Sequence, residues 1–207
     1  MKIFTTLFGS PRAKKVYEAK EKFRKKTSAL RNIGEAIAIA TENCYRKTLP
    51  LLDFREERDR QLVNVYIYYE YLYFFRHLAL REAFNHLSIS QMNILHEYIA
   101  GVFIPRTVDK FLKQCPEEMR PGLRIEFFKR LNDMEASYGN SRELFAKKNP
   151  CASDALTSKV SKNVMRIIGD PDNSSAIRNI IIIVTDAYHS MKLKNLIGKA
   201  KQHIKIE

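Results

Sequence analysis

Residues 65–75 read VYIYYEYLYFF, and this stretch decides the fold class. Its β-branched and aromatic residues give it a strand-like composition, but both faces of such a strand would be aromatic, so the required alternation fails. Neither glycine nor proline occurs between residues 51 and 100, so no turn residue separates the stretch from its neighbours. We therefore expect a buried helix, apolar on all sides, in an all-α fold.

Start and stop signals divide the rest of the sequence into further helices. The sharpest is Ser88, followed three residues later by Gln91, which is the capping-box pattern of a helix N-terminus. With 7 glycines and 7 prolines in 207 residues, the chain is poor in the turn signals of a β-sandwich. We expect an irregular helical bundle of seven or eight helices. Besides the helix that contains residues 65–75, they should cover residues 11–48, 88–104, 107–115, 122–138, 142–148, 154–168 and 175–203.

The first of these helices is expected to be long and basic. Ser10 and Pro11 form a helix start, and apolar residues then recur every seven positions, at Val16, Phe23 and Leu30. An unbroken helix over residues 11–48 would measure about 57 Å, whereas a compact chain of this size has a diameter of about 43 Å. Its N-terminal half should therefore project from the bundle, unless Gly34 breaks the helix. We expect a single all-α domain over residues 11–207, preceded by a short apolar arm at residues 1–10.

Positive charge is concentrated toward the two ends of the sequence. The net charge is +13, and residues 1–52 alone carry +8. Nine basic residues lie between Arg12 and Arg31 against Glu18 and Glu21, and five lysines without an acidic residue lie between 192 and 205. The first helix could neutralise nucleic-acid phosphates or bind an anionic membrane surface, or it could be a solvated basic face. The candidate anion-binding residues are Lys14, Lys15, Lys22, Arg24, Lys25 and Lys26.

Glu70 is the candidate buried polar residue, because seven aromatic residues surround it between Tyr66 and Phe75. Burial would raise the pKa of its carboxyl group, which fits either a general acid or a metal ligand. A buried carboxylate that accepts hydrogen bonds from tyrosine hydroxyls or an arginine is the favoured alternative. We therefore expect replacement of Glu70 by glutamine to change stability more than any activity.

The segment Arg81-Glu-Ala-Phe-Asn-His86 resembles the Arg-x4-His motif of the all-α HEPN ribonucleases, with Glu82 where that family has asparagine. The resemblance implies an RNA-cleaving enzyme in which Arg81 and His86 act on the scissile phosphate. Five residues of helix, however, turn the two side chains about 140° apart, so we expect them to diverge. A surface pair near a helix end is the alternative.

Other signals limit the possible chemistry and the compartment. The sequence has no Gly-rich phosphate loop, no HExxH and no G-x-S-x-G, and a single Asp-x-x-His at Asp186 falls short of a di-metal bundle. Three cysteines without a CxxC pair (Cys44, Cys115 and Cys151) and a weak apolar N-terminus favour a cytoplasmic protein. We expect no catalytic residue, no metal and no cofactor. The leading hypothesis is a non-enzymatic interaction protein whose basic first helix binds an anionic partner or forms a homodimer.

Overall fold

The computed structural model describes residues 11–51, 57–146 and 154–204, with side chains from residue 17 in the first range and from residue 60 in the second. These residues form a helical bundle without strands, which confirms the all-α prediction for this part of the chain. The longer elements are α1 (Pro11–Thr48), α2 (Glu57–Phe84), α3 (Ile89–Tyr98), α4 (Ile104–Leu112), α5 (Arg120–Gly139), α6 (Leu156–Ile168), α7 (Ser174–Met191) and α8 (Leu193–His203). Short 3-10 turns cover Leu49–Leu51 and Glu117–Met119, and a π-helical turn covers Ile99–Phe103. The apolar arm expected at residues 1–10 lies outside the described residues.

Residues 65–75 form the centre of α2, which confirms the helix predicted from their lack of alternation. Neighbouring helices supply partners for the tyrosine hydroxyls on different sides of α2. Tyr69 and Tyr73 donate to backbone carbonyl oxygens of α5, at 3.1 and 2.8 Å, and the Tyr71 hydroxyl lies 2.6 Å from Thr48 Oγ1 at the end of α1. A buried hydroxyl without a partner is costly, so these bonds explain how a tyrosine-rich helix can be enclosed.

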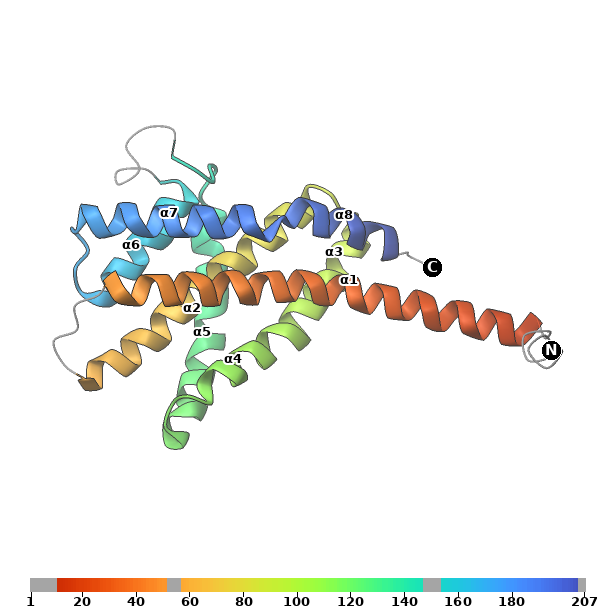
Figure 1. Ribbon diagram of the computed structural model, residues 1–207, viewed down its shortest axis with the longest axis horizontal. Coiled ribbons are helices and arrows are strands. Elements are labelled where there is room, and N and C mark those ends of the chain that lie inside the picture. Colours follow the sequence, from red (N-terminus) through yellow and green to blue (C-terminus); the bar gives the residue numbers. More distant parts are fainter. Residues whose placement is uncertain (1–10, 52–56, 147–153, 205–207) are drawn as a thin grey trace, which may run out of the picture.

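The long first helix is confirmed, and it continues through Gly34 without a break. Its C-terminal half packs on α2 and α7, while its N-terminal half borders α8 over residues 21–32 and then extends past the bundle (Figure 1). Gly34 lies in the packed half, where the ring of Phe103 fills the space that a side chain would occupy. A Cβ atom at Gly34 would lie 2.6 Å from Cδ2 of that ring. The glycine therefore serves close packing of α1 on the π-helical turn.

We expect Gly34→Ala to lower the free energy of unfolding by about 1 kcal/mol, because overpacking outweighs the gain in helix propensity. The reference is Phe103→Ala, which removes the ring from this space. In that background Gly34→Ala should instead stabilise the protein by about 1 kcal/mol, the helix propensity difference alone. Urea denaturation of the four proteins measures both effects. The same sign in both backgrounds would contradict the proposed contact.

The helix predicted over residues 142–148 is wrong for its described part, since residues 140–146 are not helical. The backbone carbonyls of Glu143 and Leu144 accept hydrogen bonds from the N–H groups of Leu156 and Thr157, in the first turn of α6. Carbonyls engaged in this way cannot accept the bonds of a local helix. The segment therefore caps α6 instead of forming a helix of its own.

The single helix predicted over residues 175–203 is also wrong, because Lys192 divides it into α7 and α8. Lys192 has the left-handed conformation, with φ 50° and ψ 40°. Its neighbours Met191 and Leu193 are both buried, although residues two apart in a continuous helix point about 160° away from each other. The change of direction at Lys192 lets both side chains enter the core, and this offsets the cost of a left-handed lysine.

The helix expected to end at Ile104 and Pro105 continues past both residues. The π-helical turn joins α3 to α4 without a loop, and Pro105 lies in the first turn of α4. Proline is tolerated there because its φ, fixed at about −65°, already fits the first turn of a helix. The capping box predicted at Ser88 and Gln91 is present at the N-terminus of α3, which confirms that boundary.

Candidate anion-binding site

The projecting half of α1 carries the cationic surface predicted from the sequence. No residue between 17 and 28 is buried, whereas Ala29, Leu30 and Ile33 enter the core. Lys22, Arg24 and Lys25 are exposed and Lys26 is half-buried, while the side chains of Lys14 and Lys15 lie outside the described residues. The ribbon of this half extends beyond α8 and the other helices (Figure 1).

A groove of about 230 Å³ lies where this half of α1 meets α8. Three cations line it, Arg24 and Lys25 on α1 and Lys199 on α8, together with His203. Glu21 is the acidic residue in the lining, and its carboxylate forms an ion pair of 3.8 Å with Arg24. The remaining lining residues are Ser28, Ala29, Asn32 and Leu196. The groove therefore combines an excess of positive charge with hydroxyl and amide donors, which suits a phosphate group.

Gln91 holds the end of α8 that contributes Lys199 and His203 to this groove. Its Oε1 atom accepts the Ser88 N–H at 3.1 Å as part of the capping box. Its Nε2 atom donates to the carbonyl oxygens of Lys201 and Ile204, at 3.1 and 2.7 Å. One side chain thus caps the start of α3 and the end of α8, where carbonyl groups lack helical partners.

We expect Gln91→Glu to lower the free energy of unfolding by about 1 to 2 kcal/mol, because it replaces two donated hydrogen bonds by a carboxylate facing carbonyl oxygens. The variant keeps an acceptor for the Ser88 N–H, since a glutamate carboxylate also serves at this capping-box position. Ser88→Ala is the matched control, because it weakens the capping box and leaves the bonds to α8 intact. Denaturation of both variants separates the two functions. A Gln91→Glu variant as stable as the parent would contradict the clamp on α8.

Glu70 is buried, at 5% exposure, and accepts hydrogen bonds from two neighbouring helices. The Tyr138 hydroxyl of α5 and the Asn163 amide of α6 both donate to its Oε1 atom, the amide at 2.7 Å. Burial is the main cause of a raised pKa for this carboxyl group, although the two hydrogen bonds act in the opposite direction. The geometry makes Glu70 a hydrogen-bonded link between α2, α5 and α6.

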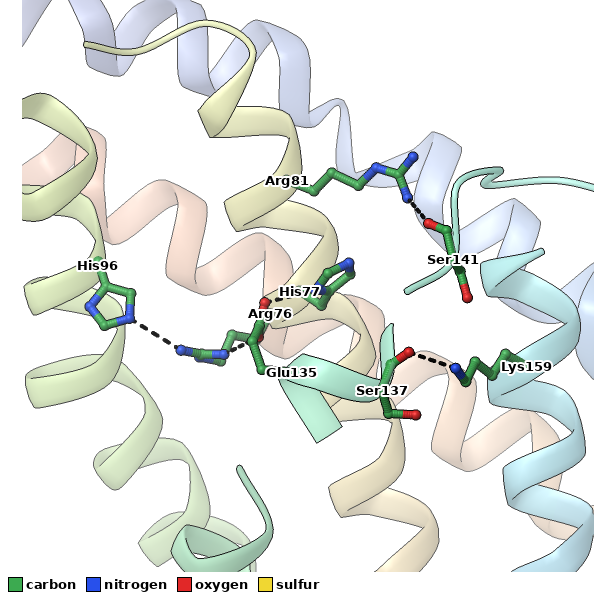
Figure 2. Close-up of polar contacts among 8 residues, drawn as sticks. All are labelled: Arg76, His77, Arg81, His96, Glu135, Ser137, Ser141 and Lys159. Atoms are coloured by element: carbon green, nitrogen blue, oxygen red, sulfur yellow. Dashed lines mark hydrogen bonds and ion pairs between the residues drawn. The ribbon is translucent and has the colours of Figure 1, made fainter. Parts of the chain in front are cut away.

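A second polar cluster, in which Arg76 and His77 are buried, joins α2 to α3 and α5 (Figure 2). The Glu135 carboxylate pairs with the Arg76 guanidinium and, at 2.7 Å, with His77 Nδ1. Arg76 Nη2 also lies 3.4 Å from His96 Nε2. Glu135 has a lowered pKa, since its bonds to His77 and Arg76 outweigh the opposing effect of burial, which is the largest single contribution. Arg76 Nε and His77 Nε2 are buried without a hydrogen-bond partner among the described residues.

Arg81 and His86 have separate partners. The Arg81 guanidinium donates to the backbone carbonyls of Ser141, at 3.0 Å, and Arg142, just beyond the end of α5. Lys159 donates in the same way to Ser137, so Figure 2 shows two cations directed at carbonyls near this helix end, where the helix dipole favours positive charge. His86 instead follows the end of α2, and its Nε2 atom lies 2.9 Å from Oε1 of Glu82, in the last turn of that helix. No described contact brings the two side chains to one shared partner.

Comparisons with family models, curated proteins and solved structures gave no match. Within the described residues, no group of three or more His, Cys, Asp or Glu side chains could hold a metal ion. No helix in this part of the chain is long and apolar enough to cross a membrane. The function therefore has to be inferred from the surface chemistry of the molecule.

The sequence predicted the cations on the α1 side of the groove but not those on the α8 side. Arg24 and Lys25 were candidates because they lie in the basic first helix. Lys199 and His203 were not, because the sequence does not show that α8 packs beside the projecting half of α1. The run of five lysines without an acidic residue was the available signal.

Proposed function

We propose that this protein is a non-enzymatic nucleic-acid-binding protein that contacts phosphates through α1 and α8. The observation that carries the proposal is the meeting of two basic stretches, about 170 residues apart in the sequence, at one groove. Cations gathered on one surface release counterions from a polyanion, which is the main source of sequence-independent affinity for nucleic acid. A cytoplasmic location, expected from the cysteines, stays a prediction.

The length of the cationic surface favours a polymer over a small anion. From Pro11 to Asn32 the helix extends about 33 Å, at 1.5 Å per residue. A single phosphate or a nucleotide would occupy the groove and leave the cations before residue 21 without a role. A nucleic-acid chain can contact both in succession, because its phosphates repeat along its length.

A peripheral membrane anchor is less well supported by the exposed apolar residues. Tyr17 and Phe23 are 58% and 71% exposed on the projecting half. Six helical positions place them about 120° apart around the axis, so they do not form one continuous apolar face. An interfacial helix needs such a face to enter the headgroup region.

The test measures retention on heparin, RNA, DNA and anionic liposomes at two salt concentrations. We expect a fivefold variant of Lys14, Lys15, Lys22, Lys25 and Lys26 to alanine to lose retention on the nucleic acids. A second variant, Lys25→Ala with Lys199→Ala, removes one cation from each wall of the groove and should weaken retention too. The matched control also removes five exposed cations, Arg106 and Lys110 on α4, Lys113 just after it, Lys129 on α5 and Arg178 on α7. Unchanged retention of the fivefold variant would overturn the proposal.

Self-association through α1 is the second candidate, and the stripe of apolar residues along this helix supports it. Phe23 continues the seven-residue spacing of Leu30, Ile37 and Cys44, but unlike them it lies outside the core. A second copy could cover Phe23 by packing along the projecting half. Sedimentation equilibrium of the full chain and of Phe23→Ser tests this candidate. A parent protein that stays monomeric at high concentration would exclude it.

A further inference from the structure

A cleft of about 180 Å³ lies between α1 and α7, next to the groove between α1 and α8. Because α7 and α8 follow one another along α1, the cleft lies further along the same helix as the groove (Figure 1). Asn32, which lines the groove, is one turn of α1 from Ala36, which lines the cleft. A linear ligand that lies in the groove therefore reaches the cleft.

The cleft carries no net charge, unlike the groove. Lys47 on α1 and Asp186 on α7 are the charged residues in its lining, and both are exposed. Asn43 and Ser190 add an amide and a hydroxyl group, and the other lining residues are alanine, isoleucine, cysteine and methionine. Since the two opposite charges cancel, a phosphate is attracted to the groove and not to the cleft. The cleft therefore suits a neutral group with apolar faces and polar edges.

A nucleobase is a group of this kind. Its flat faces pack against apolar side chains, and its edges carry hydrogen-bond donors and acceptors that asparagine, aspartate, lysine and serine contact. In a duplex the faces are stacked and the edges are paired, so only an unpaired base can enter a cleft. The volume is below the range of about 300 to 1,000 Å³ that holds drug-sized ligands, which fits one small group.

We propose that the cleft between α1 and α7 holds one base of a single nucleic-acid strand whose phosphates lie in the groove between α1 and α8. From Glu21 to Lys47 the groove and the cleft together extend about 39 Å along α1. A stacked strand of about 12 nucleotides, at 3.4 Å each, covers this length. This inference rests on the proposed nucleic-acid binding and adds the class of nucleic acid and a site for base recognition.

Asp186 determines which base the cleft prefers. A carboxylate only accepts hydrogen bonds, so it favours a base with an exocyclic amino group. Cytosine has such a group at N4, whereas thymine, which is also a pyrimidine, presents a carbonyl oxygen at the same place. We therefore expect a cytosine strand to bind more tightly than a thymine strand that has the same number of phosphates.

The experiment measures this preference with fluorescence anisotropy of the full chain. The probes are labelled single strands of twelve deoxycytidines or twelve thymidines, titrated at salt concentrations between 50 and 200 mM. The cleft variant is Asp186→Ala, and Asp133→Ala on α5, which also removes one exposed carboxylate, is its matched control. The groove variant is Lys25→Ala with Lys199→Ala.

We expect the parent to bind the cytosine strand at least about fivefold more tightly than the thymine strand, as for one contact to a base edge. Asp186→Ala should abolish this ratio, and Asp133→Ala should keep it. The groove variant should weaken binding of both strands and keep the ratio. Loss of two phosphate contacts makes the logarithmic salt dependence shallower by about 1.4 for a single strand. Over this salt range the parent would then lose about sevenfold more affinity than the groove variant.

Two results would overturn the inference and leave nucleic-acid binding intact. One is a parent protein that does not prefer the cytosine strand. The other is an Asp186→Ala variant that keeps the preference of the parent, because the base would then be read elsewhere. Absence of binding to both strands at low salt would instead remove the proposed function itself.

Discussion

Replacing Glu70 by alanine is expected to lower the free energy of unfolding by about 3 kcal/mol, because the buried Tyr138 hydroxyl and the half-buried Asn163 amide lose their acceptor and a cavity remains. Tyr138 is completely enclosed, so its hydroxyl cannot turn to water when Glu70 is removed. Relief of the desolvated carboxylate offsets part of this loss. Urea denaturation measures the difference. Glu126→Ala is the control, since Glu126 also accepts a tyrosine hydroxyl, from Tyr66 at 2.8 Å, but in a partly exposed position.

The conservative variant Glu70→Gln separates hydrogen bonding from charge. Glutamine keeps an oxygen acceptor for Tyr138 and Asn163 and cannot ionise. Because the folded protein raises the pKa of Glu70 above its ordinary value of 4.5, the stabilisation by the bound proton is complete below that value. It is lost as the pH rises through the raised pKa. The parent should show this loss and Glu70→Gln should not, so identical pH profiles would contradict the role of the buried carboxyl group.

Replacing Glu135 by alanine is expected to lower the free energy of unfolding by about 3 kcal/mol, at the lower end of the range for breaking a buried ion pair. Arg76 is 5% exposed and would keep its charge without a carboxylate partner. The lower end applies because the Glu135 side chain itself is 36% exposed. Asp109→Ala is the control, because it breaks an exposed pair of 2.8 Å with Arg124 and should cost less than about 1 kcal/mol.

The Arg76–Glu135 pair also predicts the behaviour of the protein in acid. The folded protein lowers the pKa of Glu135, so this group stabilises the fold above pH 4.5 and loses that contribution as the pH falls through the lowered pKa. The sign is opposite to that of Glu70. Thermal denaturation from pH 7 down to pH 3 should show a shallower loss for Glu135→Gln than for the parent. A parallel loss in both proteins would show that the pair does not control acid stability.

Local sequence signals predicted those parts of the fold that depend on neighbouring residues. The lack of alternation at residues 65–75 predicted the buried helix α2, and Ser88 with Gln91 predicted the start of α3. Segments that depend on distant partners were missed. The carbonyls of Glu143 and Leu144 are taken by α6, which no local pattern shows.

The same distinction between local signals and distant contacts applies to the residues of the candidate site. Lys22, Arg24 and Lys25 could be assigned from charge density within a single helix. Lys199 joins them through the packing of α8 against α1, and this packing depends on the turn at Lys192 and on the hydrogen bonds from Gln91. The clusters around Glu70 and Glu135 likewise need α5 and α6 in place. Sequence patterns identified the chemical groups, and tertiary contacts determine which of them meet.

The contact between Gly34 and Phe103 has a consequence for the axial position of α1. The buried residues of α1 recur every three or four positions, at Leu30, Ile33, Ile37 and Ala40. Such a helix can slide along its neighbours by one turn, about 5.4 Å, and still bury similar side chains. The Phe103 ring fits against Gly34 because this position lacks a Cβ atom, and the residues one turn away, Leu30 and Ala38, do not. The ring therefore works as a stop against sliding. It sets how many residues of α1 extend beyond the bundle, and so the reach of its positive charges.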